Sequence, residues 1–379
     1  MRVLMLIDNE YGVGTFWRGY NIARNLTRDF DVNITIVHLS RRRLGRITLK
    51  SEGGVALMSV PRTGFLSIPI YSLISIFKDY DLLHVFAAAK ASTGFAAMFT
   101  KTFSRKKVIV DWDDWWTRGG LFGHSFSGEL HRFLEEVNPQ LADATIVVSD
   151  LLYKRARALG IPSNKIYKVI NGADTSLSIY PRDEALERLH LPRNRFYILY
   201  AGLSIHSQEF LVFLKAFRAF VDRYRNAVLI ILGNVPSTYL KYVQKLGVED
   251  NVHAPRYVPF NEYLLYLSIA DAFLLPADPT VVEAARFPIR LGDYLVAGKP
   301  ILISDVGEMG RFVRECGCGI VVKPRSPEGW LDGLIKLLED DGMRLEMGVK
   351  AEYCAEKFSW RNLAHQIYNI YKRILDRVD

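Results

Sequence analysis

The sequence is poor in cysteine, and its few cysteines form no recognisable pattern. Only three occur among the 379 residues, at Cys316, Cys318 and Cys354. A structural zinc site is built from paired C-x-x-C spacings, and a disulfide framework uses an even number of cysteines. We therefore expect neither in this chain. So low a cysteine count is also typical of a protein from a reducing compartment.

Long hydrophobic runs are missing as well. A membrane-spanning helix needs about 18 consecutive apolar residues. The longest apolar candidate, residues 65–77, is shorter and is interrupted by Pro69 and three serines. The N-terminal apolar run 2–7 has no small-residue cleavage site behind it, which favours a first β-strand over a signal peptide. From these absences we expect a cytoplasmic protein without a transmembrane segment.

The composition is that of a folded globular protein, with 49% hydrophobic and 24% charged residues. A length of 379 residues suggests two or three domains. The formal net charge is +8, and most of the excess lies in residues 1–190, which hold 25 Lys and Arg against 19 Asp and Glu. Such a surplus predicts an anionic partner. The basic residues are densest in two clusters: Arg41, Arg42, Arg43, Arg46 and Lys50, and Lys101, Arg105, Lys106 and Lys107.

The first basic cluster lies shortly before the apolar run 65–77 in the sequence. A basic segment near an apolar one is typical of proteins that attach to an anionic membrane surface, so peripheral attachment is one hypothesis. The alternative is a solvated loop followed by a buried helix. Nucleic acid is disfavoured as a partner, because no binding module or basic motif with interleaved aromatic residues occurs.

Short apolar, β-branched runs alternate with helical stretches along the chain. Such runs are typical of parallel strands that are buried on both faces of a sheet. The expected strands are 2–7, 32–38, 55–60, 82–86, 107–111, 144–149 and 166–170, then 196–202, 227–233, 272–276, 300–304 and 319–322. A polar stretch, 174–195, separates the two series. The pattern predicts an α/β protein with two Rossmann-like, doubly wound parallel-sheet domains, 1–180 and 190–358, that face each other across a ligand-binding cleft.

A glycine-containing loop, D-N-E-Y-G-V-G-T-F-W, follows the first expected strand. Gly12 and Gly14 match the first two glycines of the dinucleotide fingerprint G-x-G-x-x-G, but Trp17 stands at the third position. No acidic residue ends the second strand, so an oxidoreductase is disfavoured. The two glycines still permit the backbone to approach a ligand at a helix N-terminus, the alternative being a simple tight turn.

A loop rich in acid and tryptophan, D-W-D-D-W-W-T-R-G-G, follows the fifth expected strand. Within six positions it holds Asp111, Trp112, Asp113, Asp114, Trp115 and Trp116. A D-x-D pair is a possible ligand set for a divalent metal, although one short pair is a weak signal. Tryptophan rings suit stacking on sugars or a place at a membrane interface. Because functional residues concentrate in loops at the carboxyl ends of such strands, the segment is a candidate site.

The most informative segment is E-A-A-R-F-P-I-R-L-G-D-Y-L-V-A-G-K-P, residues 283–300. Pro288 suits the first turn of a helix, and Gly298 suits its C-terminal end. Arg290 and Asp293 are three residues apart, so they share one face of that helix. The arginine, beside a helix N-terminus, is suited to bind a diphosphate, and the aspartate to accept hydrogen bonds from the hydroxyls of a ribose. The alternative is an ordinary surface ion pair.

Together these motifs resemble those of GT-B-fold glycosyltransferases, and most closely those of retaining family 4. The resemblance extends over nearly the whole chain. Besides the glycine loop and the segment 287–300, it rests on V-I-N-G-A-D (169–174), A-G-L (201–203), I-L-G-N (231–234), A-D-A-F-L-L-P (270–276) and D-V-G-E-M (305–309). The final helix, expected within 360–379, resembles the one that crosses back to the first domain in that family.

The resemblance implies that a sugar moves, with retention of configuration, from a nucleotide sugar on the second domain to an acceptor on the first. It implies electrostatic stabilisation of the leaving diphosphate and no required metal or other cofactor. Since the basic surplus lies in the acceptor domain, we expect a lipid-linked or other anionic acceptor. The donor-binding candidates are Gly12, Gly14, Gly202, His206, Gly233, Arg256, Arg286, Arg290 and Asp293. The catalytic candidates are Asp113, Asp114 and Glu283, and the acceptor-binding candidates are Trp112, Trp115 and Trp116.

Three positions depart from the family pattern. Ala285 stands where a first glutamate is usual, eight residues before Asp293, and Glu283 is a possible substitute. Leu203 and Gln208 stand where an arginine and a lysine usually face the donor phosphates. The missing cations motivate a competing hypothesis, a non-catalytic sugar- or lipid-binding homologue. A third hypothesis is a GT-B-like epimerase that uses no acceptor.

Overall fold

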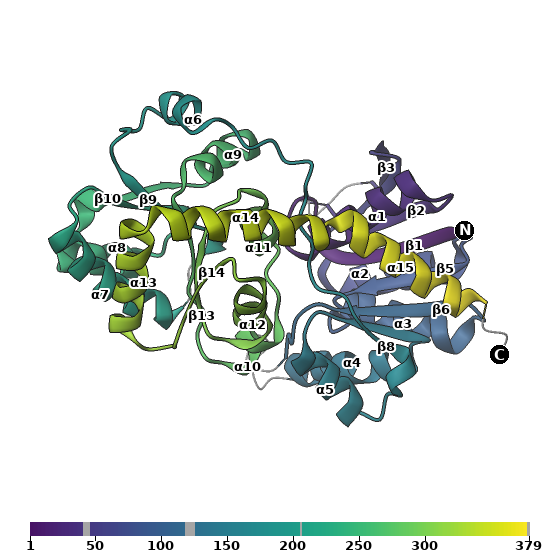
Figure 1. Cartoon of the computed structure of the whole chain (residues 1–379). Helices are drawn as coiled ribbons and strands as arrows, with labels where there is room; N and C mark the ends of the chain where they lie inside the picture. Colours follow the sequence, from purple (N-terminus) through teal and green to yellow (C-terminus); the bar gives the residue numbers. More distant parts are fainter. Residues whose placement is uncertain (41–45, 118–125, 205–206, 377–379) are drawn as a thin grey trace. The chain divides into compact units, whose positions relative to one another are not determined.

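The chain folds into two compact α/β units (Figure 1). The computed structural model describes residues 1–40, 46–117, 126–204 and 207–376. The first unit comprises Met1–Gly172, the short segment Ala285–Ile289 and the chain from Trp360 onward. The second unit comprises Ala173–Ala284 and Arg290–Ser359. Each unit is built on one sheet, as the alternation of apolar and helical stretches predicts.

The sheet of the first unit has eight strands in its described part, in the order β3-β4-β2-β1-β5-β6-β7-β8. They are β1 Arg2–Glu10, β2 Asn33–Leu39, β3 Thr48–Glu52, β4 Val55–Val60, β5 Leu82–Phe86, β6 Lys107–Trp112, β7 Ala144–Val147 and β8 Ile166–Lys168. The sequence predicted all of these except β3, which pairs antiparallel with β4 at the sheet edge. Every residue of β3 is exposed, so T-L-K-S-E has no apolar run to mark it as a strand.

Helices cover the sheet of the first unit. They are α1 Thr15–Asp29, α2 Ser67–Phe77, α3 Ala91–Phe103, α4 Phe126–Leu141, α5 Asp150–Ala158 and α15 Trp360–Leu375, with short 3₁₀ turns at Gly64–Leu66 and Ser163–Lys165. Helix α15 packs on α1, where the Asp29 carboxylate accepts hydrogen bonds from Arg361 at 2.7 Å and His365 at 2.8 Å. Phe30 also stacks on Tyr368. These contacts confirm that the final helix belongs to the first unit.

The sheet of the second unit has six strands in its described part, in the order β11-β10-β9-β12-β13-β14, and all of its pairs are parallel. They are β9 Phe196–Ser204, β10 Ala227–Asn234, β11 Val252–Arg256, β12 Ala272–Leu275, β13 Ile301–Ser304 and β14 Gly319–Val322. The strand order reverses between β9 and β12, and ligands of doubly wound sheets bind beside the carboxyl ends of such strands. Strand β11, V-H-A-P-R, was not predicted because Pro255 and polar residues interrupt it.

Helices also surround the second sheet. They are α6 Arg182–Leu189, α7 Gln208–Arg223, α8 Ser237–Leu246, α9 Phe260–Ile269, α10 Val281–Ala285, α11 Arg290–Val296, α12 Gly307–Cys316, α13 Pro327–Glu339 and α14 Asp341–Lys357, with a 3₁₀ turn at Glu249–Asn251. Phe210, Phe213, Phe217 and Phe220 of α7 are buried in the core with Trp330 of α13. Burying each phenylalanine stabilises the fold by roughly 1.5–3 kcal/mol, so this cluster holds α7 firmly on the sheet.

The cysteines correct one expectation from the sequence. Cys316, at the end of α12, forms a disulfide with Cys354 of α14, while Cys318 is free and buried. The expectation of no disulfide is therefore wrong for this pair. The two cysteines are separated by 38 residues and belong to no local motif, and the packing of α12 against α14 brings them together.

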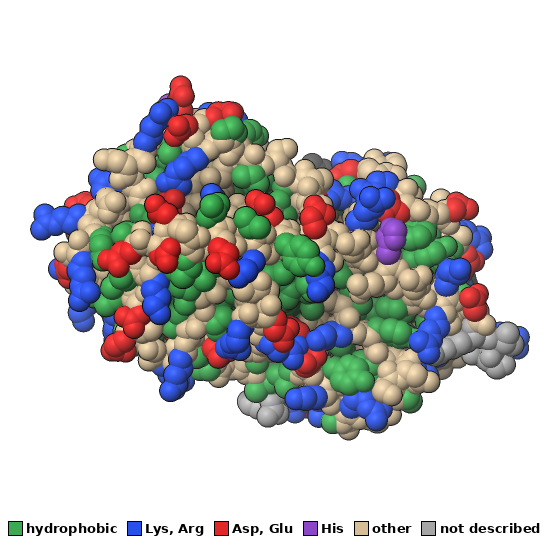
Figure 2. All heavy atoms as spheres, viewed as in Figure 1, with side chains coloured by type: hydrophobic (Ala, Val, Ile, Leu, Met, Phe, Trp, Pro, Cys, Tyr) green, Lys and Arg blue, Asp and Glu red, His purple; other side chains and the backbone are tan. Residues whose placement is uncertain are grey.

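The second unit is nearly balanced in charge. Its residues, Ala173–Ala284 and Arg290–Ser359, hold 21 Lys and Arg against 24 Asp and Glu. Figure 2 shows basic and acidic side chains interspersed over the helices of this unit on the viewed face. Within the described ranges, every helix is too short or too polar to cross a membrane.

Candidate functional site

The predicted donor-binding residues Gly202 and Arg290 lie against each other in the second unit. Gly202 lies near the carboxyl end of β9, at the switch point of the sheet. A Cβ atom at Gly202 would lie 2.9 Å from the Tyr200 hydroxyl and 3.1 Å from Nη1 of Arg290. The guanidinium of Arg290 lies 5.4 Å from the centroid of the Tyr200 ring. A larger residue at position 202 would therefore require the Tyr200 hydroxyl and the Arg290 guanidinium to shift.

The charge of Arg290 is available to a ligand. Among the described residues, its guanidinium forms no ion pair with a carboxylate, and its buried Nε has no hydrogen-bond partner. Burial opposes the charge, but Tyr200, Tyr294 and Glu283 outweigh this effect and raise the pKa of Arg290. The side chain therefore stays cationic. Glu283, on α10, acts on it through space.

Asp293 lies one helical turn after Arg290 on α11 and has a partner that the sequence did not suggest. The Tyr263 hydroxyl, on α9, donates a hydrogen bond of 2.9 Å to Oδ2 of Asp293. Burial, with a smaller contribution from the nearby Asp174, raises the pKa of Asp293 to about 7, although the Tyr263 hydrogen bond acts to lower it. Tyr263 is 30 residues away in the sequence, so no local spacing connects the two.

Helix α11 begins later than the sequence predicted. Pro288 was expected in its first turn, but the helix begins at Arg290, and residues 286–288 are extended or irregular. Gly298 ends the helix as expected, with a φ of +62° that favours glycine. Its N–H donates to the carbonyl oxygen of Leu295 at 3.1 Å. Arg290 thus occupies the first helical position.

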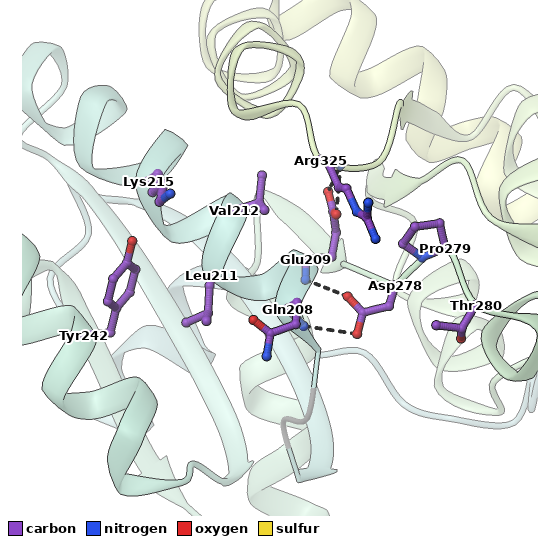
Figure 3. Close-up of a pocket in the computed structure, with 10 residues that line it drawn as sticks. All are labelled: Gln208, Glu209, Leu211, Val212, Lys215, Tyr242, Asp278, Pro279, Thr280 and Arg325. Carbon is purple, nitrogen blue, oxygen red and sulfur yellow. Dashed lines mark hydrogen bonds between the residues drawn. The ribbon is translucent and has the colours of Figure 1, made fainter. Parts of the chain in front are cut away.

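The side chain of Asp278 caps the N-terminus of α7. Gln208, the first residue of that helix, stands where the family resemblance implies a lysine. Oδ1 of Asp278 accepts a hydrogen bond from the N–H of Glu209 at 2.8 Å, and Oδ2 accepts one from the N–H of Gln208 at 3.1 Å (Figure 3). Asp278 lines a cavity of about 510 Å³ with Lys215 and Arg325. A carboxylate that already caps these N–H groups disfavours a second anion at the helix end.

The remaining predicted donor residues lie in different places. Gly233, near the end of β10, has a φ of +117°, and Arg256, at the end of the edge strand β11, has a φ of +69° and is exposed. His206 lies outside the described residues, as does the side chain of Leu203. No contact connects Gly233 or Arg256 with Arg290 in the described part of the chain.

Arg286, predicted to bind the donor, belongs to the first unit and pairs with a predicted catalytic residue. Its Nη2 lies 2.9 Å from Oδ2 of Asp114. Two further contacts hold this segment in the first unit, since Ser149 Oγ donates to the carbonyl oxygen of Ala285 at 2.7 Å and Asn171 Nδ2 donates to that of Phe287. Arg286 and Asp114 offset each other's charge, which reduces what either offers to a ligand.

Asp113 lies beside the glycine loop of the first unit. Oδ2 of Asp113 accepts a hydrogen bond from Oγ1 of Thr15, the first residue of α1, at 2.8 Å. Its buried Oδ1 has no partner among the described residues. Burial and the neighbouring Asp111 raise the pKa of Asp113 to about 6. Gly12 and Gly14, with φ values of +81° and +52°, form the turn that leads into α1.

Asp111 serves the interior of the first unit rather than a ligand. It is fully buried, and its Oδ1 accepts a hydrogen bond from Nε of Arg18 at 2.9 Å. Its Oδ2 lies 3.4 Å from Nε2 of His84, whose Nδ1 is 2.6 Å from the Tyr371 hydroxyl of α15. Asp111 and Asp113 thus have different partners. The described residues include no group of three or more side chains placed to bind a metal.

The three tryptophans of the loop differ in exposure. Trp112 is buried in the sheet and its Nε1 donates to Oε1 of Glu135 at 3.2 Å, so its ring offers no open face. Trp115 and Trp116 are partly exposed. Glu135, a buried residue of α4 that the sequence did not single out, also accepts the N–H of Trp116 at 2.8 Å and that of Thr117. It therefore fixes the conformation of the loop.

Comparison with known proteins identifies similar chains. Residues 181–353 match the family described as "Glycosyl transferases group 1". A D-inositol 3-phosphate glycosyltransferase from Corynebacterium glutamicum is 30% identical over 220 residues, which is 55% of this chain and 51% of that protein. This chain thus spans about half the length of the curated relatives it matches first.

Solved structures with the same fold cover nearly the whole chain. Sucrose-phosphate synthase from Thermosynechococcus elongatus has a TM-score of 0.78 at 14% identity, with 98% of each chain covered. HepE from Anabaena, solved in complex with UDP-glucose, has a TM-score of 0.74 at 13% identity, with 98% of this chain and 100% of that one covered. These likenesses and the two parallel-sheet units confirm the GT-B fold that the sequence predicted.

Proposed function

Since residues 181–353 match the group 1 glycosyl transferases and the fold is GT-B, we propose that this chain transfers a sugar from a nucleotide sugar to an acceptor. The observation that carries the proposal is the placement of Arg290. It is a cation without a carboxylate partner among the described residues, at the switch point of the second sheet, where doubly wound folds bind their ligands.

Arg290 binds the diphosphate of the donor in this proposal. A guanidinium forms two parallel hydrogen bonds to phosphate oxygens, and such charge-assisted bonds are about twice as strong as neutral ones. Asp278 already accepts a hydrogen bond from the N-terminus of α7. That helix end is therefore not free to bind the phosphates of the donor. The diphosphate charge therefore depends on Arg290 and on the start of α11.

Asp293 binds the ribose of the donor, one helical turn after Arg290. When ionised, its carboxylate has lone pairs for two adjacent hydroxyls even while it accepts the Tyr263 hydrogen bond. Glu283, whose charge acts on Arg290, fills the place of the glutamate that Ala285 replaces. Support for a nucleotide-sugar donor comes from HepE, which was solved with UDP-glucose.

Catalysis in this proposal is electrostatic and retains the configuration of the sugar. The charge that develops on the leaving diphosphate is stabilised by Arg290, which is fixed in place before the reaction begins. Asp113, whose pKa of about 6 lies near neutrality, is placed to exchange a proton in the first unit. The proposal requires no metal and no other cofactor.

The acceptor in this proposal is anionic and lipid-linked or otherwise amphiphilic. Helix α2 supports it, because Leu73 and Phe77 are exposed although they are apolar, while Tyr71 is among the residues that the helix buries. We call the exposed apolar residues of this region the α2 apolar face: Phe65, Leu66, Leu73, Phe77 and Phe103 of the adjoining α3. A solvent-exposed apolar face of this kind suits a membrane interface.

Basic residues adjoin the α2 apolar face. Nζ of Lys106 donates a hydrogen bond of 2.7 Å to the carbonyl oxygen of Lys78, the residue after Phe77, which places Lys106 at the C-terminal end of α2. Apolar and cationic groups on one surface bind anionic lipids together. We therefore propose peripheral attachment at the cytoplasmic face of a membrane.

The activity is tested by nucleotide-sugar turnover. Purified protein is screened against UDP-, GDP-, ADP- and dTDP-sugars by thermal shift, and release of the nucleoside diphosphate is measured for each donor that binds. A donor at a hundredfold over its Kd should stabilise the protein by ~2.7 kcal/mol. The competing hypothesis, a non-catalytic homologue, is favoured by the Asp278 cap. It predicts binding without release of diphosphate under any condition.

A further inference from the structure

A second cavity, in the first unit, adjoins the glycine-containing loop that follows β1. It has a volume of about 570 Å³ and opens at the carboxyl ends of the strands. The end of β1, the connection from β4 to α2, the start of α3 and the first turns of α4 line it. Its size falls within the range of about 300–1,000 Å³ that is typical of small-molecule sites.

One side of this cavity offers hydrogen-bond acceptors. Asp8 and Asn9 lie there, at the end of β1. Oδ2 of Asp8 accepts a hydrogen bond from Ser92 Oγ at 2.6 Å. Oδ1 of Asn9 is buried and has no hydrogen-bond donor among the described residues. Buried oxygens without a donor are rare in folded proteins, so a ligand hydroxyl is the natural partner for this one.

The other side of the cavity is basic. Arg62 and Lys90 line it from two connections, and His131 lines it from α4. Burial raises the pKa of Asp8, while Lys90, Arg62 and His131 act to lower it, so all three side chains lie close enough to act on the acceptor side. Arg62 also pairs with Glu10 at 3.0 Å. A ligand with an anionic group is attracted to this side.

The rim of the cavity connects it with the two surfaces already described. Phe65 and Ile68 lie on the rim, and Phe65 is also part of the α2 apolar face. The ammonium of Lys90 lies 5.5 Å from the centroid of the Trp116 ring, in the loop predicted to bind the acceptor. The cavity is therefore continuous with the surface on which an acceptor is expected.

We propose that this cavity binds the acceptor, and that the acceptor is a polyol that carries a phosphate group, either free or as the head group of a lipid. This inference rests on the glycosyltransferase function proposed above. Hydroxyl groups satisfy Asp8 and Asn9, and the phosphate interacts with Lys90, Arg62 and His131. An inorganic anion leaves the acceptor side unused, and a neutral sugar leaves the basic side unused, so the two halves together select a phosphorylated polyol.

The test measures binding to the full chain by calorimetry, with inositol 3-phosphate, myo-inositol and inorganic phosphate as probes. We expect inositol 3-phosphate to bind at least tenfold more tightly than either of the others. Lys90→Gln should weaken it at least tenfold, while Lys154→Gln, at an exposed lysine of α5 without a hydrogen bond or ion pair in the described part of the chain, should leave it unchanged. Vesicles with and without phosphatidylinositol phosphate distinguish a lipid head group from a free polyol phosphate.

Each outcome decides the proposal. Equal affinity for the three probes, or equal effects of Lys90→Gln and Lys154→Gln, overturns it. Binding only to the phosphoinositide vesicles, lost in Lys90→Gln, supports it with a lipid as the source. UDP binding, which uses the second unit, is measured in parallel and reports correct folding of each variant. Inositol 3-phosphate binding without any sugar-nucleotide turnover contradicts the proposed function and leaves the cavity assignment standing.

Discussion

The carboxylate of Asp293 accepts a hydrogen bond from the hydroxyl of Tyr263 at 2.9 Å. This hydrogen bond connects α9 with α11, the helix that carries the residues proposed to bind the diphosphate and the ribose. It also sets the charge of Asp293, because burial raises the pKa of this carboxyl to about 7 while the hydroxyl lowers it.

Donor binding should therefore depend on pH through Asp293. The carboxyl is largely protonated below its pKa of about 7 and ionised above it, so affinity for UDP should rise between pH 6 and pH 8. Tyr263→Phe removes a hydrogen bond that favours the charged form, and we expect it to shift this dependence to higher pH. Calorimetric titration with UDP across this range measures both effects. A dependence that is flat, or the same in both proteins, would show that Asp293 does not contact the ribose.

Arg290→Ala should impair donor binding more than Asp293→Ala. The arginine is the main cation for two phosphate groups, and hydrogen bonds to charged groups are worth about 1.5–3 kcal/mol, or roughly ten- to a hundredfold in Kd. Arg290→Lys should recover only part of the affinity, because lysine lacks the planar fork of the guanidinium. Kd values for UDP and for uridine separate the two roles, since uridine lacks phosphate. Wild-type affinity for UDP in Arg290→Ala rules out this assignment.

Gly202→Ala should weaken UDP binding without unfolding the second unit. The added Cβ would lie 3.1 Å from Nη1 of Arg290 and 2.9 Å from the Tyr200 hydroxyl, so the guanidinium must shift. Gly342→Ala is the matched control, because an added Cβ there would lie in ordinary contact, 3.4 Å from Oδ1 of Asp340. We expect a several-fold higher Kd for the first variant only. Identical UDP affinities of the two variants would mean that UDP binding does not depend on the present position of the Arg290 guanidinium.

The α2 apolar face should govern attachment to membranes. Phe77 and Leu73 are 78% and 53% exposed, so replacing both with serine removes apolar area with little cost to the fold. We expect the double variant to lose most of its sedimentation with anionic vesicles, and high salt to weaken attachment of the wild type. Phe260→Ser, at an exposed phenylalanine of the second unit, is the control. Equal sedimentation of all three proteins contradicts membrane attachment through α2.

The docking of α15 on α1 should weaken at acidic pH. Arg28, His365 and Arg361 lower the pKa of Asp29, so this carboxylate stabilises the folded chain at neutral pH and loses that effect as the pH falls below its unfolded value near 4. Asp29→Asn should reduce stability at pH 7, by about 1 kcal/mol at most for pairs near the surface. The difference from wild type should be smaller at pH 3 than at pH 7 but not zero, because the lowered pKa of Asp29 in the folded chain keeps this carboxylate largely ionised at pH 3. Thermal melts at both pH values, with the exposed Asp31→Asn as control, measure it.

The fold could be predicted from the sequence because its strands are apolar runs. All strands of both sheets were expected except β3 and β11. Every residue of β3 is exposed, and Pro255 interrupts β11. In these two cases pairing with a neighbouring strand, not composition, creates the strand.

The site was predictable only where its residues are close in sequence. The spacing of Arg290 and Asp293 placed them on one helix, and the structure agrees. Tyr263 beside Asp293 and Asp278 on α7 come from distant segments, so no local pattern contained them. Arg286 lies four residues before Arg290 in the sequence, but its segment belongs to the first unit. Tertiary contacts alone determine that assignment.

Sugar transfer by this chain is proposed to depend on Arg290. Measuring the release of nucleoside diphosphate from a panel of nucleotide sugars tests this dependence most directly. Wild-type protein and Arg290→Ala are compared at saturating donor, with acceptor supplied as inositol 3-phosphate and as a lipid extract. We expect release by the wild type from at least one donor and a loss of at least tenfold in Arg290→Ala. No release from any donor, or equal release by both proteins, would contradict it.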